Sequence, residues 1–89
     1  MDKIYKHSIN FRLRNIAGNK ILLGNEKAYT LNDTAVIIWN NINGRKNSSM
    51  IKEILVKEFN CEESIAEKDL NNFLNFLISI NAIFESQVE

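Results

Sequence analysis

A strand that runs directly into a capped helix is the feature that most constrains how this chain folds. The segment Tyr29–Leu31 has the aromatic, β-branched and apolar residues of a short strand, and the polar pair Asn32-Asp33 follows at once. Either polar side chain can accept hydrogen bonds from the first free amides of a helix. The next apolar residues recur at i, i+3, i+4 and i+7, one helical stripe made of Ala35, Ile38, Trp39 and Ile42. A helix placed so closely behind a strand fixes the pose of that strand's edge.

The residues before this segment predict two more strands. Ile9, Phe11 and Leu13 alternate with polar residues, which is the pattern of a strand with one buried face. A mostly buried strand is expected at 20–23, and a third at 27–31, with turns at Gly18-Asn19 and Gly24-Asn25. Turns this short favour an antiparallel meander, which leaves two unpaired edges.

The rest of the chain predicts two further helices. Gly44 is placed to end the first helix in the left-handed conformation, and Asn47 or Ser48 opens the second. The apolar stripe of the second helix is Ile51, Ile54, Leu55 and Phe59. The third helix is expected from about Glu62 to Ile80, with Asn81 ending it and residues 82–84 packing back on the core. The predicted fold class is α+β, winged-helix-like, with a three-stranded antiparallel sheet followed by a three-helix bundle over residues 1–89, a single domain.

Composition argues against a membrane-spanning or secreted protein, and the charges are unevenly distributed along the chain. The 89 residues are 45% hydrophobic, and eleven basic side chains balance eleven acidic ones. Residues 1–27 carry six basic and two acidic groups, net +4, whereas residues 62–89 carry one basic and six acidic, net −5. A single cysteine, no membrane-length apolar run and no signal-peptide pattern lead us to expect a cytoplasmic protein.

The sequence offers few residues or motifs that could support catalysis. His7 is expected to be a solvated residue, and Cys61 a small apolar filler beside Phe59. One histidine and one cysteine cannot form the usual four-ligand Cys/His metal site. No glycine-rich phosphate loop or serine elbow is present. We therefore expect no enzymatic activity, no metal and no cofactor.

The third helix is more apolar than one buried face requires. Ala66, Leu70, Phe73, Leu74 and Leu77 form a stripe for the core, and Ile65, Phe76 and Ile80 extend it on one flank, with Asp69 among them and Asn72 at its rim. Either the sheet or Ile83-Phe84 covers this flank, or it is exposed for a partner. The strand at 27–31 has no proline or inward charge to prevent pairing, so an extended peptide could add to its edge. The alternative is an ordinary edge strand.

Two other function classes remain open from the residues alone. A winged helix can bind DNA, but the third helix offers Lys68 against four acids between Glu62 and Asp69, whose charge repels phosphate. The basic residues elsewhere, Arg12, Arg14, Lys20, Arg45 and Lys46, could form only a weak basic face. An open strand edge beside an apolar flank could also drive self-association.

The order of these motifs resembles a known family. Two turn-linked strands lead into Tyr-x-Leu-Asn-x-Thr-Ala-x-x-Ile-Trp at 29–39, a Gly-Arg-Lys turn follows at 44–46, and the second helix ends in Glu58-Phe59. The third helix carries Asp-Leu-x-x-Phe-Leu at 69–74 and finishes with Ile80-Asn81-Ala82-Ile83. Over about residues 8–84 the chain is similar to the PqqD-like family, the RiPP recognition elements. Asn81-Ala82 stands where a Gly-Leu pair is common, and Asn tolerates the left-handed cap.

The resemblance implies a non-catalytic domain that binds the leader of a ribosomally made precursor peptide and presents it to a modifying enzyme. The enzyme would be a radical SAM enzyme or a lasso-type leader protease, with no nucleic acid or membrane partner and a monomer or weak dimer as the binding unit. The leader would be held as an added strand in a cleft between the third strand and the third helix. Carried over by position, the peptide-binding residues are Lys27, Ala28, Tyr29, Thr30, Leu31, Ile65, Asp69, Asn72, Phe73 and Phe76. The basic amino-terminal part predicts an acidic leader.

Overall fold

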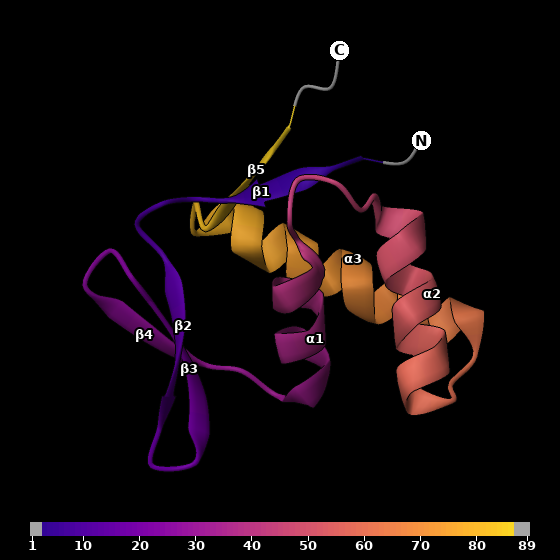
Figure 1. The fold of residues 1–89 in the computed structure, drawn as a ribbon, viewed down its shortest axis with the longest axis horizontal. Helices are drawn as coiled ribbons and strands as arrows, with labels where there is room; N and C mark the ends of the chain where they lie inside the picture. The colour runs from indigo at the N-terminus through magenta and orange to yellow at the C-terminus, as the bar shows by residue number, and fades with distance from the viewer. Residues whose placement is uncertain (1–2, 87–89) are drawn as a thin grey trace.

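The computed structural model describes residues 3–86, in which five strands and three helices form two small sheets and a helical layer (Figure 1). In chain order these are β1 (Tyr5–His7), β2 (Arg12–Ile16), β3 (Asn19–Gly24), β4 (Lys27–Thr30), α1 (Asp33–Asn41), α2 (Ser48–Phe59), α3 (Glu63–Ser79) and β5 (Ile83–Glu85).

The predicted antiparallel meander is confirmed, with strand order β2-β3-β4. β3 lies in the middle, and Leu22 on it pairs with Leu13 of β2 and Tyr29 of β4. The prediction that Ile9 lies on the buried face of the first strand is wrong, because Ile9 is 93% exposed and precedes β2. Phe11 is buried as expected. The Phe11 ring lies where a side chain at Gly24 would be, so the hairpin leaves room for it only because position 24 is glycine.

Both hairpin turns lie one residue away from the predicted positions. Ile16 pairs with Asn19 and Gly24 pairs with Lys27, so each loop has two residues, 17–18 in one case and 25–26 in the other. All four loop residues have positive φ: Ala17 52°, Gly18 84°, Asn25 52° and Glu26 64°. This is the type I′ turn, whose twist matches that of the flanking strands. Ala17 and Glu26 therefore adopt a left-handed conformation that is unfavourable for residues with a Cβ atom.

Asparagine side chains set the starts of two helices, as predicted. The Asn32 Oδ1 accepts from the Ala35 amide at 2.8 Å, and the Asn47 Oδ1 accepts from the Met50 amide at 2.9 Å. Gly44 does have a positive φ of 79°, but α1 ends earlier, and its cap residue Ile42 is extended. The glycine instead lets the following loop approach β1, where its amide donates to the Tyr5 carbonyl at 3.0 Å.

The end of α3 follows the predicted left-handed cap. Asn81 has φ 63°, its amide donates to the Ile78 carbonyl at 3.0 Å, and the Ala82 amide donates to the Leu77 carbonyl at 2.9 Å. These two bonds are the Schellman pattern. Ala82 and Leu77 are both completely buried, which supplies the hydrophobic contact that accompanies it.

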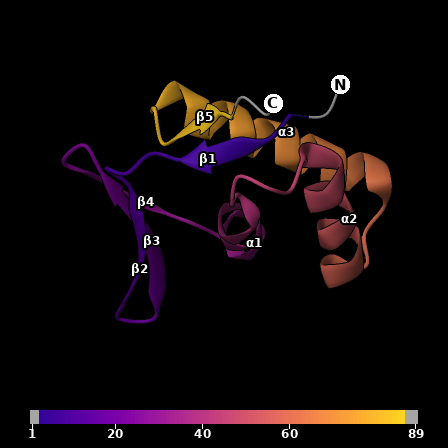
Figure 2. The same cartoon turned by 45° about the horizontal axis from the view of Figure 1, so that its top comes forward.

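The protein also has a second sheet of two strands, which was not predicted. β1 pairs antiparallel with β5, with Lys6 opposite Phe84, and so joins the two ends of the described chain across α3 (Figures 1 and 2). Ala82 and Ile83 are buried, as expected for a segment that packs back on the core, but Phe84 is 50% exposed. Strands of three residues carry too little alternation to be recognised in a sequence.

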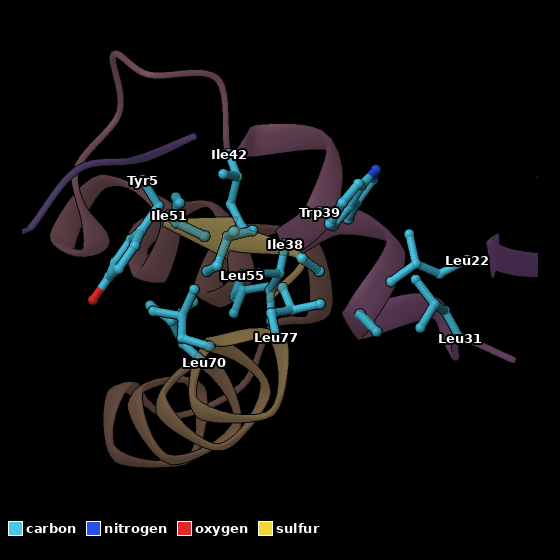
Figure 3. Close-up of a cluster of buried hydrophobic side chains, with 14 of the residues drawn as sticks. Tyr5, Leu22, Leu31, Ile38, Trp39, Ile42, Ile51, Leu55, Leu70 and Leu77 are labelled. Carbon is cyan, nitrogen blue, oxygen red and sulfur yellow. The ribbon is translucent and has the colours of Figure 1, made fainter. Parts of the chain in front are cut away.

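The core runs between the helices and reaches the sheet at α1. Figure 3 shows Leu22 and Leu31 directed toward α1 on one side, and Tyr5, Ile51 and Leu70 gathered on the other. Ile38 and Leu77 are completely buried between these groups. Phe59, predicted for the buried stripe of α2, is 39% exposed, whereas Cys61 is half-buried against the core.

The expectation that His7 is solvated is wrong. Its ring stacks on Trp39 with centroids 3.7 Å apart and an interplanar angle of 6°. Its Nε2 donates to the Trp39 carbonyl at 2.8 Å, since a carbonyl can only accept. Burial lowers the pKa of His7 below 6.5, and the hydrogen bond opposes part of that shift. Through this stacking and hydrogen bond, His7 packs the β1–β5 sheet against α1.

This contact makes the free energy of unfolding depend on pH. Because the folded pKa lies below the unfolded value of 6.5, the unfolded chain binds the proton more readily. The His7 contribution to stability is therefore complete above pH 6.5 and declines as the pH falls toward the folded pKa. We expect urea denaturation to show a fall in stability from pH 7.5 to 5.5 that is smaller in His7→Phe, which keeps a ring but cannot titrate. An equal fall in both proteins would show that His7 is not responsible.

The strained turn at Asn25-Glu26 predicts a stabilising substitution. Glu26→Gly creates an Asn-Gly pair, which the type I′ turn prefers, and should raise the free energy of unfolding by about 1 kcal/mol. Urea denaturation measures the change. Glu26→Ala removes the same carboxylate but keeps a Cβ at positive φ, so it should give no comparable gain; an equal gain would assign the effect to charge.

Candidate functional site

The outer edge of β4 is open in the part of the chain that the structure describes. β4 is the last strand of its sheet, and the C-terminal strand β5 pairs with β1 instead of covering it. The Leu31 amide donates to the Lys20 carbonyl at 2.9 Å, which marks Leu31 as a residue bonded to β3. Bonded positions recur at every second residue of an antiparallel ladder, so Tyr29 also faces β3. Ala28 and Thr30 therefore direct their N–H and C=O groups outward, away from the sheet.

An open groove of about 660 Å³ lies beside this edge, a size typical of ligand clefts. β4 forms one wall, the start of α1 forms the floor and the middle of α3 forms the opposite wall. The lining residues are Ala28, Tyr29, Thr30, Leu31, Asn32, Thr34, Ala35, Ile38, Asp69, Asn72, Phe73 and Phe76.

Three aromatic rings form one end of the groove. The Tyr29 and Phe76 rings meet edge to face with centroids 5.3 Å apart, and the Phe73 and Phe76 rings stack at 6.1 Å. Phe76 is nevertheless 36% exposed, so Tyr29 and Phe73 cover only part of its ring. The apolar flank of α3 is thus left partly open to solvent.

The structure brings together most of the residues predicted for the site. Ala28 to Leu31, Asp69, Asn72, Phe73 and Phe76 all line the groove. Lys27 begins β4 but does not line it, and Ile65 is 49% exposed outside it. The floor was not predicted; it is formed by Asn32, Thr34, Ala35 and Ile38. The short connection from β4 into α1 was the available signal, because it places the first turn of the helix beside the strand.

The groove carries a single charged side chain, Asp69, among the residues that line it. Asp69 is exposed and makes no ion pair or side-chain hydrogen bond within residues 3–86, whereas Glu63 and Glu67 of α3 both lie within 4.0 Å of the Lys52 Nζ. Among the same residues, no group of three or more His, Cys, Asp or Glu side chains is placed to hold a metal ion. The helices of the described chain are also too short or too polar to cross a membrane.

Comparison with known proteins identifies the family. The model of the family described as coenzyme PQQ synthesis protein D (PqqD) matches residues 19–83, from β3 to the first residue of β5. This chain belongs to the PqqD family. The resemblance carried by its motifs is thereby confirmed. No curated protein is significantly similar to it in sequence.

Solved structures share the fold of this PqqD-family chain. The PqqD truncation of Methylobacterium extorquens PqqCD, described as a functional and stand-alone RiPP recognition element, has a TM-score of 0.76 and 25% identity over 91% of this chain and 88% of that one. TbiB1 in complex with the TbiA(beta) leader peptide has a TM-score of 0.78 and 20% identity, covering 93% and 99%. A lasso peptide synthetase B1 complexed with the leader peptide has a TM-score of 0.78 and 18% identity, covering 90% and 96%. The predicted fold class is confirmed.

Hydrogen exchange tests the orientation of the β4 edge. The amides of Ala28 and Thr30 point away from β3, so they should exchange with solvent much faster than those of Tyr29 and Leu31, which the ladder protects. Residue-resolved exchange by NMR measures all four amides in one sample, so each pair serves as the control for the other. Equal protection at all four would contradict an open edge.

Proposed function

We propose that this protein binds the leader segment of a ribosomally synthesised precursor peptide by β-strand addition to β4. It then presents the rest of the precursor to a modifying enzyme and performs no chemistry itself. The observation that carries the proposal is that the N–H and C=O groups of Ala28 and Thr30 face outward, unpaired within residues 3–86, directly beside an aromatic groove. Membership of the PqqD family and the leader-bound state of two proteins with the same fold support it.

Main-chain hydrogen bonds would set the position of the leader. An extended segment pairing with β4 can exchange bonds with Ala28 and Thr30, the two residues whose backbone groups face outward. Each such bond contributes about 1 kcal/mol net, and the short edge limits their number. Backbone pairing therefore fixes the leader without reading its sequence.

Side chains would supply the specificity. On an added strand, every second side chain lies on the same face as Tyr29 and Leu31, which is the face toward α3. An apolar leader side chain at such a position can cover the open part of Phe76 and extend the ring cluster with Phe73. The lost freedom of the flexible leader offsets part of this gain. We expect a dissociation constant between micromolar and high nanomolar, about 8 kcal/mol or slightly more.

The proposed setting is the cytoplasm, where a ribosomal peptide is made. The proposed enzyme partner is a radical SAM enzyme or a lasso-type leader protease, and the proposed binding unit is a monomer or weak dimer. DNA binding has weaker support, because Glu63 and Glu67 are exposed on α3, the helix that would enter the groove of the duplex, and the exposed Glu62 immediately precedes it. Light scattering across concentration tests self-association through the same edge.

Two substitutions test the groove by titration with candidate leader peptides. Phe76→Asp removes an apolar contact and adds a charge, so the affinity should fall about thirtyfold or more. Thr30→Pro removes an outward amide without breaking the β3–β4 ladder, so the affinity should fall about fivefold. Isothermal titration measures both.

Ile78→Asp is the matched control. It makes the same kind of change at a residue that is 43% exposed on α3 but outside the groove, so it should leave the affinity unchanged. Unchanged binding in both groove variants, with circular dichroism showing folded proteins, would rule out this groove as the leader site.

A further inference from the structure

We infer that Asp69 makes the groove select a leader with a lysine or arginine close to its apolar anchor residue. The inference rests on the proposed function, because it concerns the peptide that occupies the same groove. It reverses the expectation of an acidic leader that the basic amino-terminal part of the sequence raised.

The charges that line the groove carry this inference. Lys and Arg side chains are absent from the lining within residues 3–86, and Lys27, the basic residue of β4, does not reach it. Asp69 faces the groove with a carboxylate that no side chain of the described chain neutralises. The basic residues behind the net charge of +4 therefore do not form the site. A cationic leader side chain would supply the missing partner, whereas an acidic one would be repelled.

The charged residues near Asp69 also favour a cationic leader side chain. Residues 62–69, the N-cap and first turns of α3, include four acids and one base, Lys68. Lys52 of α2 is the basic side chain near this part of the helix, and it already lies within 4.0 Å of Glu63 and 3.9 Å of Glu67. Glu63 and Glu67 therefore lie toward α2 and outside the groove, and Lys52 is already engaged with them and does not neutralise Asp69. Asn72 lies one helical turn further on and adds an amide that can accept from the same cation.

The helical spacing sets the distance between the two features that a leader must match. Asp69 and Phe76 are separated by seven residues of one helix, which is about 10 Å at 1.5 Å per residue. An extended peptide that runs alongside α3 would cover the same distance in about three residues. Residues on one face of a strand are two or four apart, and the long side chain of lysine or arginine bridges the remainder. The expected leader motif therefore has an apolar residue with a basic residue two or four positions away.

Peptide display tests this inference even when the sequence of the natural leader is unknown. A library of random twelve-residue peptides is selected against the wild-type protein and against Asp69→Lys. Wild-type selections should enrich an apolar residue with lysine or arginine two or four positions away. Selections on Asp69→Lys should instead enrich aspartate or glutamate there. Glu53→Lys makes the same charge change at an exposed residue of α2 outside the groove, and should reproduce the wild-type motif.

Synthetic copies of the enriched wild-type peptides then give the magnitude. Asp69→Asn, which keeps the shape of the side chain, should weaken binding roughly threefold, and Asp69→Lys roughly tenfold. Replacing the basic residue of the peptide by glutamate should restore binding to Asp69→Lys. The Asp69→Asn effect should shrink as salt is raised.

The outcomes separate this inference from the proposed function. Peptides that lose binding in Phe76→Asp but show no basic preference would overturn the role of Asp69 and leave strand addition in place. Failure to enrich any peptide that depends on Phe76 and Thr30 would overturn the proposed function, and this inference with it.

Discussion

The packing of α1 against the end of β4 is the constraint on which the site depends. Asn32 caps α1 immediately after the strand, and Leu31, Leu22 and Ile38 are buried together at this junction. No flexible linker separates strand from helix, so β4 cannot shift without breaking the cap and opening the core. The open edge and the groove floor are consequently held in one arrangement before any peptide arrives, which lowers the free energy needed to order the complex.

An exposed strand edge is a liability that proteins usually cover, and this one is kept small. β4 has four residues, and only Ala28 and Thr30 among them direct their backbone groups outward. α3, which forms the opposite wall of the groove, packs against the core with one face and lines the groove with another. Ala66, Leu70 and Leu77 are almost completely buried against α1 and α2, whereas Phe73 and Phe76 face the groove. The over-wide apolar arc of α3 is explained by these two faces, since a single core contact would need only one.

Much of this arrangement could be predicted because its causes are local. The Asn32 cap, the Asn47 cap and the left-handed Asn81 each act within four residues, and the helical stripes follow from the period of 3.6. The failures share a different cause. Alternation placed Ile9 inside, but the chain turns before β2, and Ile9 is exposed. The prediction of a solvated His7 failed because its partner, Trp39, lies 32 residues away in sequence and comes beside it only in the folded structure.

Local sequence was sufficient to specify the order of strands and helices, the strand-to-helix junction and the residues available for the groove walls, because turns, caps and periodicity are properties of short segments. Which edge stays open depended on the tertiary structure, since that required the C-terminal strand to pair with β1 and not with β4. The sign of the charge in the groove depended on it as well. The basic amino-terminal part of the sequence predicted an acidic leader, but packing brings Asp69 to the groove and leaves Lys27 outside it. The open edge of β4 and the charge in the groove both depend on contacts between segments that are distant in sequence, so no local sequence pattern predicts them.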